Sequence, residues 1–213
     1  MKKSFKGLMV VLTLALLMIF VGCDKTDNGG GGKFKTYVME AEYIDLSQAV
    51  GAGMSSEASG VNMIWGNGES DVSKGWSSGY YIGFTYSAGL TLDFVFESSK
   101  VESATLILRL GSEIGDINFT PESLEVKLND VKINYSNLLV FGSDMASMEF
   151  EDFTLASNLE LLEGENVISI TILDNTLRSG QIGGPMIDAI KVKTKAQLSW
   201  EEKLTNPEER GAI

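Results

Sequence analysis

The chain has 213 residues, with 29 acidic and 17 basic side chains, so its formal net charge at pH 7 is −12. This charge argues against nucleic acid as a partner, because binding to phosphates needs an excess of basic residues. The chain contains no histidine, which excludes Ser-His-Asp triads, Cys-His pairs and the HExxH zinc motif. Its single cysteine, Cys23, excludes an internal disulfide and cysteine-based zinc sites.

The first 22 residues have the composition of a secretory signal peptide. Three lysines within the first six residues precede an apolar run over residues 8–21, which is shorter than the ~20 residues of a membrane span. Small residues lie immediately before Cys23, and this arrangement resembles the lipobox of bacterial lipoproteins. The resemblance implies cleavage before Cys23 and attachment of a diacylglycerol to its sulfur. The alternative is an ordinary signal peptide followed by an incidental cysteine.

Lipid attachment at Cys23 would hold the chain on a membrane, because two or more acyl chains anchor a protein stably. The sequence thus predicts an exported protein, anchored by lipid to the extracytoplasmic face of the cell membrane or to the cell surface. Residues 24–32 include four consecutive glycines from Gly29, a composition typical of a flexible tether. We therefore expect a signal peptide at 1–22, a lipidated cysteine and linker at 23–33, one domain at 34–195 and a C-terminal tail at 196–213.

The region after the linker has the pattern of β-strands separated by turns. Apolar and polar residues alternate clearly at 90–97, where every second residue is Leu or Phe. Asn129 and Asp130 separate two such runs and are typical of a hairpin turn. No stretch has helical periodicity over more than one or two turns, so the sequence predicts an all-β sandwich of about eight to ten strands, with Trp200 docked on its edge. Further strands are predicted over 34–46, 79–86, 106–110, 124–128, 133–135, 150–155, 167–173 and 187–194.

Three acidic side chains lie where the first and last predicted strands would bring them together. Glu40 and Glu42 are two residues apart, so in a strand they would point to the same side. Asp188 is expected on the same buried face as Ile190 and Val192, where a carboxylate is costly unless it is paired. The nearest lysines would point away, and clusters of carboxylate oxygens suit Ca²⁺. Alternatively, Asp188 caps a turn and the two glutamates face solvent.

Three short motifs occur in order along the chain: Glu-Ala-Glu at 40–42, Leu-x-x-Gly-x-Asn-x-Ile at 161–168 and Asp-x-Ile at 188–190. Together they resemble the carbohydrate-binding module families six and thirty-five, over residues 37–194. The resemblance implies a jelly-roll β-sandwich of the galactose-binding-like type. It also implies a structural Ca²⁺ between the first and last strands, with Glu40, Glu42 and Asp188 as ligands beside backbone oxygens.

Aromatic residues gather in the first third of the predicted domain, and sugar sites stack pyranose faces on aromatic rings. Trp65, Trp76 and Tyr80 are the candidate platforms, and both tryptophans lie in Gly-, Ser- and Asn-rich sequence typical of loops. Asn175 is a candidate partner for a sugar hydroxyl, with turn formation as the alternative. The resembling modules often have an asparagine just before the Asp-x-Ile strand. This chain has Met186 there, which points to a drier site, a different site or none at this position.

The sequence therefore predicts a non-catalytic, surface-anchored protein that binds a polysaccharide or oligosaccharide and holds it near the cell. One alternative is a structural or protein-interaction lipoprotein with the same sandwich and no affinity for sugars. Burial of the aromatic side chains at Trp65, Trp76 and Tyr80 would favour this alternative. Another is a glycosidase that uses two carboxylates, although no nucleophile motif is present.

Overall fold

The computed structural model describes residues 32–49, 63–66, 79–83, 85, 88–112, 115–142, 149–173, 176–178 and 181–203. These residues belong to one compact unit that begins at Gly32. None of the helices in these ranges is both long enough and apolar enough to cross a membrane. The predicted signal peptide and the lipidation site at Cys23 lie outside the described residues, and so does the tail after Lys203.

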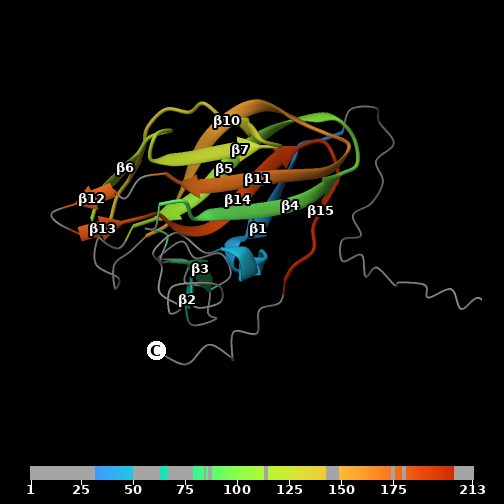
Figure 1. Cartoon of the computed structure of the whole chain (residues 1–213). Helices are drawn as coiled ribbons and strands as arrows, with labels where there is room; N and C mark the ends of the chain where they lie inside the picture. Colours follow the sequence, from blue (N-terminus) through green and yellow to red (C-terminus); the bar gives the residue numbers. More distant parts are fainter. Residues whose placement is uncertain are drawn as a thin grey trace, which may run out of the picture. The chain divides into compact units, whose positions relative to one another are not determined.

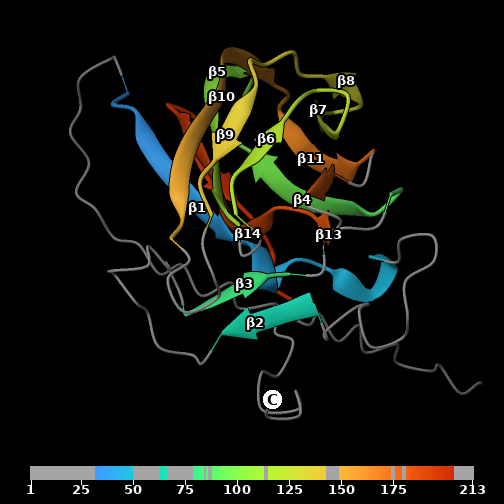
Figure 2. The ribbon, with the colours of Figure 1, turned by 90° about the vertical axis from the view of Figure 1, so that its left-hand side faces the viewer.

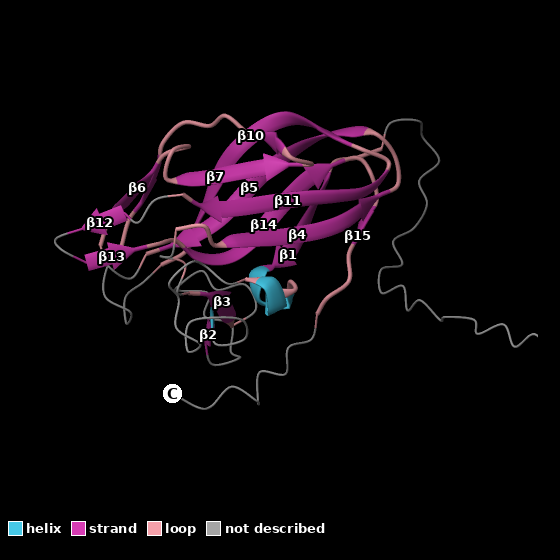
Figure 3. Ribbon diagram, viewed as in Figure 1, coloured by secondary structure: helices cyan, strands magenta, loops and turns pink. Residues whose placement is uncertain are grey.

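Antiparallel strands form most of the described chain, and its helices are two short 3-10 turns, η1 (Ala41–Tyr43) and η2 (Leu46–Gln48) (Figure 3). One sheet contains β1 (Lys35–Glu40), β2 (Ile64–Gly66), β3 (Tyr80–Ile82), β5 (Glu102–Gly111), β10 (Glu151–Leu161) and β14 (Met186–Thr194). Its strand order is β10-β5-β14-β3-β2, and β1 also pairs with β14. We call it the large sheet.

The second sheet contains β4 (Thr91–Ser98), β7 (Leu124–Leu128), β8 (Val131–Lys132), β11 (Gly164–Ile172) and β15 (Leu198–Ser199). Its strand order is β15-β4-β11-β7-β8, and we call it the small sheet. Two further pairs of strands are β6 (Ile117–Phe119) with β9 (Leu138–Val140), and β12 (Thr176–Arg178) with β13 (Gln181–Gly183).

The two sheets form two layers around one apolar core (Figure 1). Every second residue along β4 and along most of β5 and β11 is buried, as the alternation in the sequence predicts. Phe94, Leu108 and Ile170, from these three strands, are inaccessible to solvent and belong to the same cluster. Because the buried faces of the two sheets share this cluster, the predicted all-β sandwich is confirmed.

The observed strands differ from the predicted ones around the start of the domain. The first strand ends at Glu40 instead of continuing to residue 46, because the chain turns into η1. Trp65 lies in β2, inside a segment that was predicted to be a loop. A strand as short as β2 contains too few residues to show an alternating pattern, so its sequence resembles that of a loop. The strand predicted over 79–86 is observed as β3, over Tyr80–Ile82.

The first and last predicted strands lie side by side, as expected from the positions of the acidic residues. The pairing of β1 with β14 is antiparallel and continuous, from Lys35 opposite Thr194 to Glu40 opposite Ala189. Residues at the two ends of the domain sequence are thereby fixed next to each other. This part of the prediction is confirmed.

A buried amide joins two turns at one end of the small sheet. The Asn166 side chain is inaccessible to solvent; its Nδ2 donates to the carbonyl oxygens of Leu162 and Gly164, each at 2.9 Å. Its Oδ1 accepts from Asn129 Nδ2, also at 2.9 Å. Asn129 and Asp130 have φ angles of 50° and 64°, as a two-residue hairpin turn requires, so the predicted hairpin turn is confirmed. The strand that follows the turn is β8, at Val131–Lys132, and the strand predicted over 133–135 is wrong.

Replacing this amide should destabilise the domain strongly. In Asn166→Ala, the groups that Asn166 now satisfies would remain buried without partners, and we expect a loss of about 2–4 kcal/mol in the free energy of unfolding. Asn118→Ala, at an exposed position of β6, is the matched control and should change it by less than about 0.5 kcal/mol. Urea unfolding followed by circular dichroism measures both. Equal effects of the two substitutions would contradict the role assigned to Asn166.

Candidate functional site

A register shift in β14 turns Asp188 towards β5. Ala189 pairs with Arg109, and the pairing is irregular between Ile187 and Ala189. The extra residue allows Ile187 and Ile190, which are three positions apart, both to be buried in the core. Asp188 therefore does not follow the alternation of its strand, and the prediction that it shares the face of Ile190 is wrong.

The cation beside Asp188 is an arginine from the neighbouring strand. Asp188 is completely buried, and its Oδ2 lies 3.2 Å from Arg109 Nε. Arg109 also contacts Asp152 Oδ1 at 2.7 Å, and Lys191 Nζ lies 2.7 Å from Asp152 Oδ2. Two acids and two bases thus alternate across β10, β5 and β14. The sequence signal for this network was an arginine inside the alternating apolar run 106–110.

The network also sets the charge of Asp152. Partial burial raises the pKa of this carboxyl, but hydrogen bonds and charge from Lys191 and Arg109 outweigh it, and the pKa is lower than usual. Asp152 is therefore fully ionised at neutral pH. Lys191 bonds to Asp152 and is linked to Asp188 through Asp152 and Arg109.

Glu40 and Glu42 do not occupy one face of one strand, so that prediction is wrong. Glu40 is the last residue of β1, whereas Glu42 lies within η1, which packs against β14 and β3. Glu42 is 1% exposed, so the alternative in which both glutamates face solvent is wrong for this residue. Burial raises the pKa of Tyr43, and the charges of Glu42, Glu202 and Glu40 raise it further, because all three lie near its hydroxyl.

The three acidic residues predicted to bind calcium do not form a single cluster. Within the described residues, no three His, Cys, Asp or Glu side chains are grouped so that they could hold a metal ion. Glu42 and Asp188 have the chemistry that Ca²⁺ requires, since they are buried carboxylates on elements that pack together. Two carboxylates with backbone oxygens fit a calcium ion; a cluster of all three carboxylates does not occur. The calcium ion itself stays a prediction.

The predicted aromatic platform at Trp65 is partly used for packing. Trp65 is half-buried and contacts a small apolar cluster formed by Tyr81, Phe150 and Met186. A Cβ atom at Gly83 would lie 3.0 Å from Trp65 Cδ1, so the indole packs closely against the backbone at this glycine. Met186 itself is buried in this cluster, and a sugar site at this position stays a prediction.

The other predicted ligand-binding residues divide into two groups. Tyr80 is half-buried, and its apolar surface packs against the main core. Trp76 and Asn175 lie outside the described residues. The structure therefore places Trp65 and Tyr80 on the paired strands β2 and β3, with Gly66 opposite Tyr80. Whether all four predicted residues lie together stays a prediction.

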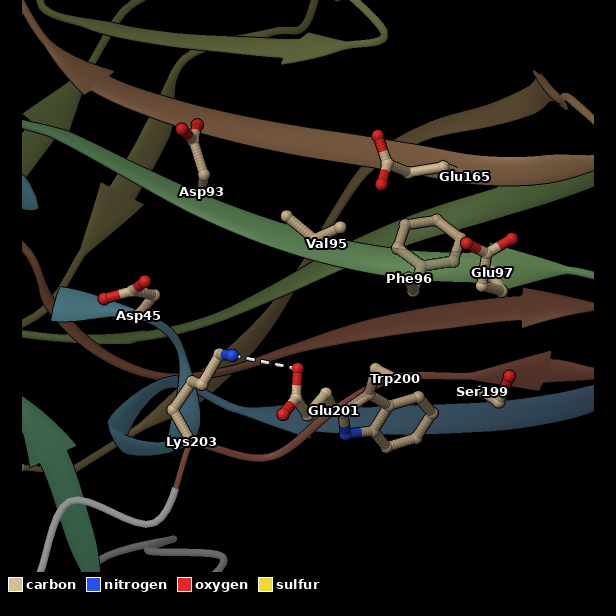
Figure 4. A pocket seen from close by; sticks show the side chains of 10 residues that line it. All are labelled: Asp45, Asp93, Val95, Phe96, Glu97, Glu165, Ser199, Trp200, Glu201 and Lys203. Atoms are coloured by element: carbon tan, nitrogen blue, oxygen red, sulfur yellow. Dashed lines mark hydrogen bonds and ion pairs between the residues drawn. The ribbon is translucent and has the colours of Figure 1, made fainter. Parts of the chain in front are cut away.

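An open cavity of about 500 Å³ lies over the outer face of β4 (Figure 4). Trp200 forms part of its wall and meets Tyr37 edge-on, with the ring centroids 6.4 Å apart. The predicted docking of Trp200 on the edge of the domain is confirmed. The segment after Trp200 is held by a hydrogen bond of 2.7 Å from Lys203 N to the Tyr43 carbonyl oxygen. The lining residues are Asp45, Asp93, Val95, Phe96, Glu97, Glu165, Ser199, Trp200, Glu201 and Lys203.

Carboxylates dominate the polar surface of this cavity. Five of its lining residues are acidic, and its one base, Lys203, is bonded to Glu201 at 2.8 Å. Hydrogen bonds from Ser47 lower the pKa of Asp45, which keeps that carboxylate charged. The cavity thus offers many hydrogen-bond acceptors and repels anions. Sequence reasoning missed it, although the polar face of the strand at 90–97 already carried the acidic pair Asp93 and Glu97.

Solved structures with a similar arrangement of strands are carbohydrate-binding modules. A family 35 module from Cellvibrio japonicus is 11% identical, with a TM-score of 0.50, over 78% of this chain and 98% of the module. A family 35 module from Clostridium thermocellum is 16% identical, with a TM-score of 0.44, over 74% of this chain and 97% of the module. The match to the GH26-CBM35 β-(1,4)-mannanase of Podospora anserina has 17% identity and a TM-score of 0.48, and covers 75% of this chain but only 27% of that protein.

The likeness to the Cellvibrio japonicus module establishes the fold. The domain has the jelly-roll β-sandwich of a family 35 carbohydrate-binding module, as the order of its sequence motifs predicted. A scan of known protein families finds no match to this sequence, and a search of curated proteins finds none either. At 11% identity the likeness concerns the fold alone.

The Arg109–Asp188 contact should be important for stability. Arg109→Met would remove the ion pair that offsets the burial of Asp188, and we expect a loss of about 3–5 kcal/mol in the free energy of unfolding. Lys191→Met removes the other base of the network but leaves this contact, and should cost less than about 1 kcal/mol. Denaturant unfolding at pH 7 compares the two variants. A smaller loss in Arg109→Met than in Lys191→Met would show that Asp188 is stabilised by other groups.

Proposed function

We propose that this protein is a non-catalytic carbohydrate-binding module, held by a lipid on Cys23 at the extracytoplasmic face of a membrane or at the cell surface. In this role it would bind a polysaccharide or oligosaccharide and keep it close to the cell. The lipobox-like sequence supports the anchor, and the fold of the domain supports the binding role. One fold can host many functions, so binding depends on the residues of a site.

The observation that carries the proposal is the cavity beside Trp200. An aromatic ring beside exposed apolar surface suits the C–H face of a sugar ring, and Val95, which is 47% exposed, provides that surface. The surrounding carboxylates can accept hydrogen bonds from sugar hydroxyls. A volume of about 500 Å³ is within the range of small-ligand sites and is large enough for one or two sugar rings.

The charge of the cavity favours an uncharged glycan. A sugar acid would place its carboxylate among Asp93, Glu97 and Glu165, and like charges at short distance repel one another. We therefore expect neutral oligosaccharides to bind more tightly than uronic acids at this site. The edge formed by β2 and β3, with Trp65 and Tyr80, is the second candidate surface on the same domain.

One observation favours the alternative of a structural or interaction protein. Trp65 and Tyr80 are each partly buried against apolar clusters, so the predicted platforms also contribute to packing. A domain in which all aromatic residues served the core would have no surface for sugar rings. Trp200 also packs against the core, but it distinguishes the two functions because it lines a cavity that is open to solvent as well.

Glycan binding should depend on Trp200. We expect the protein to bind a neutral oligosaccharide on a glycan array without releasing products, and Trp200→Ala to weaken this binding about tenfold by removing the ring. Isothermal titration calorimetry with the best array ligand measures the affinity. Trp65→Ala is the matched control and tests the second surface.

The outcomes separate the candidate functions. A tenfold loss in Trp200→Ala alone supports the cavity as the binding site, and a loss in Trp65→Ala alone would move the site to the β2–β3 edge. Release of shortened products would indicate a glycosidase. An absence of binding to any glycan on the array would favour the structural alternative.

We also propose that a Ca²⁺ ion binds between η1 and β14, with Glu42 and Asp188 among its ligands. Removal of this ion with EDTA should lower the melting temperature by about 5–10 °C, because an ion bound only by the folded state stabilises that state. Glu42→Gln weakens the site and should make the melting temperature insensitive to EDTA. Calorimetric titration of the EDTA-treated protein with Ca²⁺ provides a second measurement. A melting temperature unchanged by EDTA in the unaltered protein would contradict the proposal.

A further inference from the structure

One end of the paired strands β1 and β14, together with the residues that flank it, contains an excess of basic residues in an acidic chain. Residues 32–39 and 189–200 together contain five lysines and no acidic residue, whereas the whole chain has a formal charge of −12. The antiparallel register places Lys35 opposite Thr194, and Thr36 opposite Lys193. Lysines that are more than 150 positions apart in the sequence therefore meet at one end of the large sheet.

This end of the domain also exposes an aromatic ring. We call Lys33, Phe34, Lys35, Lys193 and Lys195 the basic end; all five side chains are exposed. Phe34 is 55% exposed, and its ring centroid lies 5.0 Å from Lys195 Nζ and 5.9 Å from Lys193 Nζ. The ring and the ammonium groups thus form one surface, in which the cations are attracted to the face of the ring.

The charge of the basic end is not neutralised by the acids around it. The ion pairs found among the described residues do not include any of its four lysines. Glu102 is close enough to be affected by Lys195, but its carboxylate is bound to Lys100 at 2.8 Å. An exposed surface with four unneutralised cations and an apolar ring is available to an anionic partner.

We propose that the basic end docks on the anionic phospholipid headgroups of the membrane to which the protein is anchored. Clusters of lysine next to an anchor bind anionic lipid surfaces, and aromatic rings settle at the level of the headgroups. The proposal rests on the lipid attachment proposed at Cys23. It further proposes that the domain has a fixed orientation on the membrane, with the basic end facing the headgroups.

The position of the basic end along the chain favours a membrane over other anionic partners. Nine residues, Asp24–Gly32, separate Cys23 from Lys33, and even fully extended they reach about 30 Å. A lipid on Cys23 thus keeps the basic end within this distance of the surface, which raises its local concentration there. An acidic polysaccharide has the same charge, but no feature of the chain holds it next to these lysines.

Vesicle binding of the unacylated chain tests the proposal without the contribution of the anchor. The protein from residue 23 onwards, with Cys23→Ser, is sedimented with vesicles of phosphatidylcholine alone or with about one third phosphatidylglycerol. We expect binding only to the anionic vesicles, and its loss at high salt, because salt screens the charges. Lys193→Gln with Lys195→Gln should weaken binding about 25-fold, since each lysine near an anionic surface contributes about fivefold.

A control pair with the same change in charge separates local docking from general electrostatics. Lys127→Gln with Lys132→Gln alters β7 and β8, which lie in the small sheet, and should change binding less than twofold. Equal losses in both pairs, equal binding to neutral and anionic vesicles, or binding to polygalacturonate without binding to anionic vesicles would each overturn the proposal. Mass spectrometry of the native protein tests acylation of Cys23 separately. An error in the proposed lipid attachment and an error in the proposed membrane docking therefore give different results.

Discussion

The antiparallel pairing of β1 with β14 is the constraint on which the features described above depend. It joins the beginning of the domain to its end, residue by residue from Lys35 to Glu40. At one end of the pair it places Glu40 and η1 beside the segment of Asp188, and at the other it brings the lysines of the two strands together. Neither grouping exists in the unpaired chain, because the partners are far apart in the sequence. The pair therefore determines both the candidate metal site and the basic end.

The fold could be predicted where residues alternate over several positions. The buried faces of β4, β5 and β11 follow this period closely, and Asn129 and Asp130 gave a correct hairpin because few residues accept their backbone angles. The alternation of buried and exposed residues no longer predicts the face of a side chain where the strand is irregular. Asp188 lies at a register shift, so counting from its neighbours gives the wrong face.

The parts of the site that could not be predicted depend on contacts between distant segments. The sequence shows that Arg109 lies in a strand, but it does not show that this strand is the neighbour of β14. The cavity combines a strand face with the segment 199–203, which appears in the sequence only as a polar tail. By contrast, the docking of Trp200 was predictable, because a large apolar side chain in a polar segment gains most by covering apolar surface.

The strand β14 also relates the basic end and the β2–β3 edge, the second candidate surface, to each other in space. Its nine residues span roughly 26 Å, from Met186, near Trp65 and β3, to Thr194, opposite Lys35. Figure 2 shows the start of β1 and the β2–β3 pair at opposite ends of the domain. If the basic end rests on headgroups, the β2–β3 edge points away from the membrane by about the length of this strand. The second candidate surface for a glycan, at that edge, would then face polymers outside the cell, whereas the opposite orientation would press Trp65 against the lipid.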